Sequence, residues 1–96
     1  MLRLIITKPA EQHLEKIARW TLRNWGEAKV EEYKHGLNMG LCNIMEHSHI
    51  GKDASDIRPN YRKLLVGEHW IFYEVTDEAV IVHGFLGVRQ KPEKHL

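Results

Sequence analysis

Apolar residues recur at helical spacing in the first half of the chain, and this pattern predicts two consecutive helices. The stripe of the first segment comprises Ala10, Leu14, Ile17, Ala18, Thr21 and Trp25. Before it, Thr7 or Lys8 can cap a helix, and Pro9 fits the first turn because its missing N–H does little harm there. The stripe of the second segment, residues 27–46, comprises Val30, Tyr33, Leu37, Leu41, Ile44 and Met45. Gly26 separates the segments, so we expect an antiparallel helical hairpin.

Shorter apolar segments predict strands on either side of this hairpin. The expected strands lie at residues 2–6, 61–66, 69–75 and 79–88. Gly67 and Glu68 make a two-residue connection that is compatible with a type II′ turn. The polar residues 47–60 are expected to form a loop, and residues 89–96 a loop or a single helical turn. The order β-α-α-β-β-β predicts an α+β fold, with the N-terminal strand and the helical hairpin packed on one face of an antiparallel sheet.

Composition limits the classes of protein that need to be considered. The 96 residues suit one domain spanning residues 1–96, and no run approaches the roughly 18 apolar residues of a membrane span. Cys42 is the one cysteine, so no internal disulfide can form, and we expect a cytoplasmic protein. The net charge of +1 provides no general attraction to nucleic acid, and we expect no sequence-specific DNA binding.

Two groups of basic residues border the predicted strands at residues 61–66 and 79–88. They are Arg58, Arg62 and Lys63 in the first group and Arg89, Lys91 and Lys94 in the second. If the last strand runs beside its neighbour, the two groups lie near each other and form a cationic rim. The alternative interpretation is that they are ordinary solvated residues at strand ends, and both interpretations fit the pattern.

Other chemistry-bearing residues indicate no compact catalytic site. Trp20 lies off the stripe of the first helix and is expected to be exposed for a partner, whereas packing is expected for Trp25 and Trp70. None of the seven histidines has another three or four residues away, and no cysteine pair accompanies them, so no metal site is expected. Cys42 has no nearby base, and phosphate-binding glycine motifs are absent, so neither a thiol enzyme nor a cofactor is expected.

Three stretches in order resemble one known family over nearly the whole chain. They are KPAEQHLEKIARWTLRNWGEAKVEEY at residues 8–33, HSHIGKDASDIRPNYRKLLVGEHWIFYEV at residues 47–75 and RQKPEKHL at residues 89–96. The first is similar to a two-helix opening with a Trp-Gly corner, the second to a signature of Arg-x-x-Tyr-Arg and Ile-Phe-Tyr, and the third to a closing Arg-x-x-Pro-x-x-His. The chain thus resembles ParE-type toxins of the RelE/ParE superfamily.

This resemblance implies the toxic component of a bacterial type II toxin–antitoxin system, with growth arrest as its effect and plasmid stabilisation as a common role. A ParD-like antitoxin would neutralise it, and DNA gyrase would be its target. RelE-type relatives instead cut mRNA in the ribosome, for which Arg62, Arg89 and His95 are the candidate catalytic residues. The tail lacks a tyrosine and His95 is poorly anchored there, so we favour gyrase inhibition without catalysis. A non-toxic antitoxin-binding corepressor is the third alternative.

Site residues follow from the resemblance together with the local charge. For the antitoxin we expect Arg58, Tyr61, Arg62 and Lys63 to bind an acidic, amphipathic segment that lies in a groove, in a hetero-oligomer. For gyrase we expect Arg89, Lys91, Pro92 and His95, with Trp20 and Trp70 as further candidates. The basic residues beside the 61–75 hairpin are thus interpreted as contacts for protein and not for nucleic acid.

Overall fold

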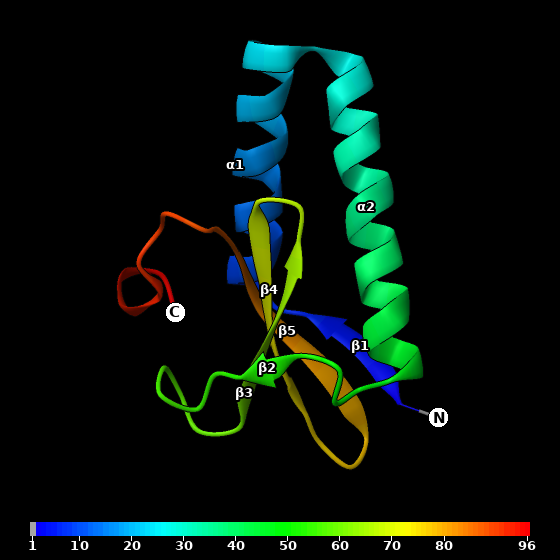
Figure 1. Cartoon of the computed structure of the whole chain (residues 1–96), viewed down its shortest axis with the longest axis vertical. Helices are drawn as coiled ribbons and strands as arrows, with labels where there is room; N and C mark the ends of the chain where they lie inside the picture. Colours follow the sequence, from blue (N-terminus) through cyan, green and yellow to red (C-terminus); the bar gives the residue numbers. More distant parts are fainter. Residues whose placement is uncertain (1) are drawn as a thin grey trace.

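The computed structural model describes residues 2–96, which form two long helices and a five-stranded sheet (Figure 1). The helices are α1 (Lys8–Trp25) and α2 (Glu27–Glu46). The strands are β1 (Arg3–Ile6), β2 (Lys52–Asp53), β3 (Tyr61–Val66), β4 (His69–Val75) and β5 (Ala79–Gly87). A single 3-10 turn, η1 (Pro92–Lys94), lies in the tail. The expected α+β class and order of elements are confirmed, with β2 as an addition inside the expected loop.

The sheet has the strand order β1-β5-β4-β3-β2 and is mixed, whereas a purely antiparallel sheet was expected. Pairings from β5 to β2 are antiparallel, but β1 runs parallel to β5, with Leu4 opposite Val80 and Ile6 opposite Val82. The apolar run at residues 2–6 carries no signal for the direction of its partner. After α2 the chain enters the sheet at β2, the edge farthest from β1. It then adds β3, β4 and β5 in turn, and β5 reaches β1 running in the same direction.

The helical hairpin forms as the sequence predicts, and it covers one face of the sheet (Figure 1). Thr7 is the cap of α1, and its hydroxyl accepts a hydrogen bond from the Ala10 N–H at 3.3 Å. Gly26 ends α1 with a φ of +87°, which a residue with a side chain rarely adopts. The two helices therefore pack side by side and bring their inner faces onto the sheet.

The main core lies between the helices and the sheet. The sheet contributes Ile71, Tyr73, Val80, Val82 and Phe85, and the helices contribute Ala10, Leu37 and Ile44. All of these side chains are buried. Removing this apolar surface from water is the main driving force for the fold.

A second, smaller core covers the opposite face of the sheet. Its buried members are Ala54, Phe72 and Leu86, against which Trp70 and Leu96 also pack. The 54–60 loop and the tail thus cover most of the face opposite the helices. The sheet is therefore buried on both sides in its centre, although the chain is short.

Tyr73 connects the main core to the loop after α2. Its side chain is fully buried, and its hydroxyl accepts the Gly51 N–H and donates to the Ser48 carbonyl oxygen, each at 2.9 Å. The Tyr73→Phe variant would leave both backbone groups without this partner. We expect a loss of about 1–3 kcal/mol in the free energy of unfolding, measured by urea denaturation.

Tyr33→Phe is the matched control for this substitution. The Tyr33 hydroxyl is buried and has no hydrogen-bond partner among residues 2–96. Its removal should therefore leave stability unchanged or raise it. Equal losses in the two variants would contradict the role assigned to the Tyr73 hydroxyl.

Candidate functional site

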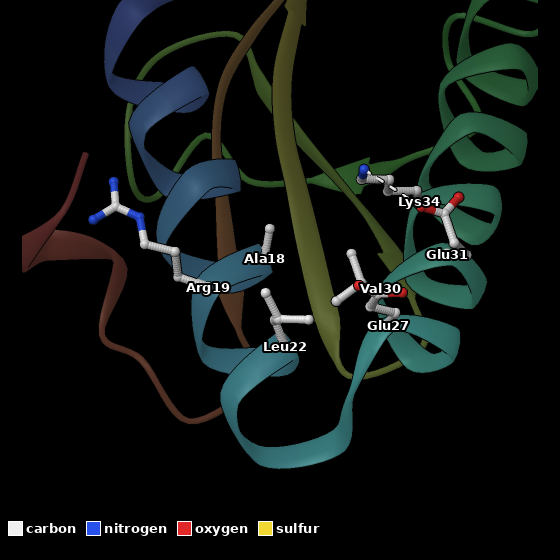
Figure 2. Close-up of a pocket in the computed structure, with 7 residues that line it drawn as sticks. All are labelled: Ala18, Arg19, Leu22, Glu27, Val30, Glu31 and Lys34. Atoms are coloured by element: carbon white, nitrogen blue, oxygen red, sulfur yellow. Dashed lines mark ion pairs between the residues drawn. The ribbon is translucent and has the colours of Figure 1, made fainter.

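A groove lies between the two helices (Figure 2). Leu22 and Ala18 of α1 point toward Val30 of α2, and these three side chains form an apolar floor. The remaining lining residues are Arg19, Glu27, Glu31 and Lys34, with the Lys34 ammonium 3.7 Å from the Glu31 carboxylate. Leu22 is 50% exposed although it is apolar. Such a floor with a polar rim suits an amphipathic helix.

The corner of the helical hairpin displays two large aromatic side chains. Trp20 is 57% exposed, as its position off the stripe predicts. Trp25 is 66% exposed, and the expectation that it packs is wrong. Trp25 is the last residue of α1, and the chain turns at Gly26 before any element can cover the ring. The corner therefore offers apolar surface beside the groove.

Arg62 forms hydrogen bonds within the protein and is therefore less available to a partner than predicted. Its guanidinium donates to the carbonyl oxygens of Gly51, at 2.8 Å, and His49, at 3.2 Å. Arg62 is paired with Tyr73 across β3 and β4, so both side chains hold the same 48–51 loop. These bonds fix the entry into β2.

Lys63 instead points to the sheet face opposite the helices. Its ammonium lies 4.6 Å from the centre of the Trp70 ring, and that of Lys52 lies 6.0 Å away. Lys52 and Lys63 are directly opposite each other in the β2–β3 pairing, an arrangement that like charges disfavour. Neither ammonium forms an ion pair with another of residues 2–96. Together with Trp70, which is partly buried as expected, they form a site that favours a carboxylate.

The strand register divides the expected cationic rim. Arg62 pairs with Tyr73 near one end of β4, whereas Arg89 follows the Gly87–His69 pair at its other end. Arg58 alone reaches the tail, where its guanidinium donates to the Leu96 backbone oxygen at 3.0 Å. The expectation that the two basic groups form one rim is therefore wrong, except at this contact. Arg62 and Arg89 therefore lie beside different ends of β4.

A cluster that was not predicted from the sequence lies on the same face of the sheet as Lys63. The His83 imidazole is 2.7 Å from the Glu74 carboxylate and stacks on the Tyr61 ring, with 4.6 Å between ring centres. The pairing of β4 with β5 shifts between Phe72 and Tyr73, and this bulge turns His83 toward Glu74. The glycines at positions 84 and 87 are possible bulge sites by sequence, and the bulge lies beside Gly84, but this signal does not predict the contact of His83 with Glu74. Tyr61, an expected antitoxin contact, is thus partly covered by His83.

Two half-buried histidines make stability depend on pH. Burial lowers the pKa of His13, and the nearby charges of His95 and Lys16 lower it further. Burial also lowers the pKa of His69, against a smaller opposing effect of Glu68. The unfolded chain, with histidine pKa values near 6.5, therefore binds more protons than the native state below that pH.

We expect the free energy of unfolding, measured in urea, to be highest above about pH 6.5 and to fall as the pH drops toward 5. The variant with His13→Gln and His69→Gln should lose less stability over this interval than the wild type. His35→Gln is the control because His35 is exposed on α2. Identical pH profiles for all three proteins would contradict the assignment.

Among residues 2–96, no three His, Cys, Asp or Glu side chains are grouped so that they could hold a metal ion. No helix in the same residues has the length and apolar character needed to cross a membrane. Cys42 is exposed on α2 and forms no disulfide.

Comparison with known proteins identifies relatives along most of the chain. Residues 4–91 match the family model described as ParE toxin of type II toxin-antitoxin system, parDE. Toxin ParE1 of Mycobacterium tuberculosis is 37% identical over 79 residues, which are 82% of this chain and 81% of the relative. Toxin ParE of Escherichia coli is 34% identical over 68 residues, 71% of this chain and 66% of the relative.

A solved structure confirms the fold. It is titled "Chromosomal ParDE TA system from P. aeruginosa" and superposes with a TM-score of 0.78 at 15% sequence identity. The match covers 91% of this chain and 96% of the other. The arrangement of helices and sheet is therefore one that such systems contain.

Proposed function

This chain belongs to the ParE toxins of type II toxin–antitoxin systems, and from that premise we propose that it inhibits DNA gyrase and is neutralised by a ParD-like antitoxin. Inhibition would act through protein docking, without catalysis by the toxin. The observation that carries this proposal is the open apolar groove between α1 and α2, which presents half-exposed Leu22 for a protein partner. The separation of Arg62 from Arg89 supports docking over RNA cleavage, because a nuclease needs its catalytic groups around one phosphate.

The antitoxin would place an amphipathic helix in this groove. Ala18, Leu22 and Val30 would contact its apolar face, and Glu27, Glu31 and Lys34 would select polar residues beside that face. Glu27 and Glu31 of α2 favour a basic residue at this point of the antitoxin helix. An acidic antitoxin segment would therefore need a second contact outside the groove.

The site formed by Lys52, Lys63 and Trp70 would supply that second contact. Two ammonium groups converge on one ring without an ion-pairing carboxylate among residues 2–96. Lys63 lies over the ring, so a nucleic-acid base would have to displace it before stacking. Leu65, which pairs with Trp70 across the strands, is 48% exposed. It would contact an apolar side chain next to the bound carboxylate in the peptide. An acidic peptide segment fits this chemistry.

The gyrase contact would lie in the tail and at two aromatic rings, the exposed Trp20 and the partly buried Trp70. Arg89 and Lys91 are exposed and provide charge, and Pro92 and His95 belong to the ordered turn around η1. Trp20 and Trp70 would add apolar contacts from other parts of the surface.

Growth and supercoiling assays test this function together. Induction of the chain in a bacterial host should arrest growth, and the purified protein should inhibit supercoiling by purified gyrase. Coexpression with the product of the neighbouring open reading frame should restore growth and yield a complex that co-purifies. Arrest with cleaved mRNA and intact supercoiling would instead favour the ribonuclease alternative, and absence of arrest would favour the corepressor.

A further inference from the structure

The tail folds back onto the protein after β5 and does not continue in the direction of the strand (Figure 1). The Val88 N–H donates to the Glu68 carbonyl oxygen at 3.0 Å, at the β3–β4 turn. The chain then passes through η1, and Leu96 reaches the second core beside Phe72 and Leu86. The last residue in the sequence thus lies near the middle of β5.

Gly84 has no side chain, and this leaves the room that Leu96 and His13 occupy. A Cβ atom at position 84 would lie 2.6 Å from Leu96 Cδ2 and 3.0 Å from the His13 ring. Both distances are too short for an ordinary contact. The φ of Gly84 is not positive, so space and not backbone conformation requires glycine here.

A hydrogen bond to Leu96 and a ring contact at His95 complete the attachment. The Arg58 guanidinium donates to the Leu96 backbone oxygen at 3.0 Å, and the His95 ring meets the His13 ring edge to face at 6.4 Å between centres. His13 Nδ1 accepts the Phe85 N–H at 3.2 Å. An accepting ring nitrogen carries no proton, so this geometry requires neutral His13 with its proton on Nε2.

We propose that Gly84, Arg58 and His13 form a latch that holds residues 92–96 against the sheet and so positions the tail for its target. This inference rests on the proposed gyrase contact. A tail that is already ordered loses less conformational entropy when it binds than a free segment would. Arg58 would accordingly act within the toxin, by holding Leu96, rather than as an antitoxin contact.

Acid should open the latch because neutral His13 is part of it. Protonation at Nδ1 removes the hydrogen bond from Phe85 and places a charge beside His95 of the tail and Lys16 of α1. The pKa of His13 is already lowered by burial and by these two neighbours. Residues 92–96 should therefore be ordered at pH 7.5 and more mobile at pH 5.

Gly84→Ala tests the latch without involving gyrase. Backbone order parameters from ¹⁵N relaxation should fall in residues 92–96 from values near 0.8 to below about 0.6, while those of β4 and β5 stay high. Gly87→Ala is the matched control, because a Cβ there would meet only Gln90, at 3.5 Å. Unchanged order parameters in the tail of a folded Gly84→Ala protein would overturn the latch.

Leu96→Ala keeps the test decisive if Gly84→Ala does not fold, since it removes the docked side chain and leaves β5 intact. Its tail should become equally mobile. In the supercoiling assay, both variants should require at least about ten times more protein than wild type for half inhibition. A mobile tail with full inhibition would overturn its positioning role. If wild type itself fails to inhibit gyrase, the proposed function fails, while the order parameters still decide the latch.

Discussion

Replacing Leu22 by aspartate is expected to weaken antitoxin binding by at least about 100-fold and to leave toxicity unchanged. A helix docked in the groove would cover Leu22, so the new carboxylate would lose water without gaining a partner. A 100-fold loss corresponds to about 2.7 kcal/mol, which is within the range for an unpaired buried polar group. Isothermal titration calorimetry with the purified antitoxin measures the change directly.

Met39→Asp is the matched control for Leu22→Asp. Met39 also lies on a helix and is 53% exposed, but it does not line the groove. Both substitutions carry a similar loss of helix propensity, so a difference between them reports docking. In cells, the Leu22 variant should arrest growth even when the antitoxin is present. Equal affinities of the two variants for the antitoxin would move the docking site away from the groove.

Arg89→Ala is expected to restore growth on induction and to raise the concentration for half inhibition of gyrase about 10- to 100-fold. Hydrogen bonds from a charged group contribute about 1.5–3 kcal/mol, which converts to this range. Arg89 is exposed and forms no ion pair among residues 2–96, so the fold should keep its stability. Removal of residues 89–96 should have a larger effect on gyrase inhibition.

Arg3→Ala controls for the loss of one exposed positive charge, because Arg3 lies on β1 and far along the chain from the tail. It should remain toxic and inhibit gyrase as the wild type does. Persistent toxicity of a folded Arg89→Ala protein would place the target contact elsewhere, and Trp20 and Trp70 would then be the next positions to replace. Circular dichroism and urea denaturation establish that each variant is folded.

Elements whose burial is periodic could be predicted from the sequence. The stripe of α2 places Leu37 and Ile44 in the main core and Val30 on the floor of the groove between the helices, and all three are buried. Gly67 has a φ of +59°, as a type II′ turn at this connection requires. These features depend on residues close in sequence, so a local pattern is sufficient to find them.

The site depends on contacts between distant residues, which no local pattern records. Arg62 is drawn to the 48–51 loop because that turn exposes carbonyl oxygens, and the loop itself has no periodic signal. His83 reaches Glu74 because a bulge shifts the register of β5. Leu22 lies off the predicted stripe, and its exposed position between the helices becomes visible only when α1 and α2 are placed together.

The place of β5 has a consequence for how the toxin is made. β5 is a central strand that pairs with β1 on one side and β4 on the other, although it is the last strand to be synthesised in the described chain. A growing chain on the ribosome can form the helical hairpin early, because its contacts are local. It cannot close the sheet until residues 79–87 emerge. We therefore expect an unfinished chain to be harmless, and an active toxin to form in one late folding step.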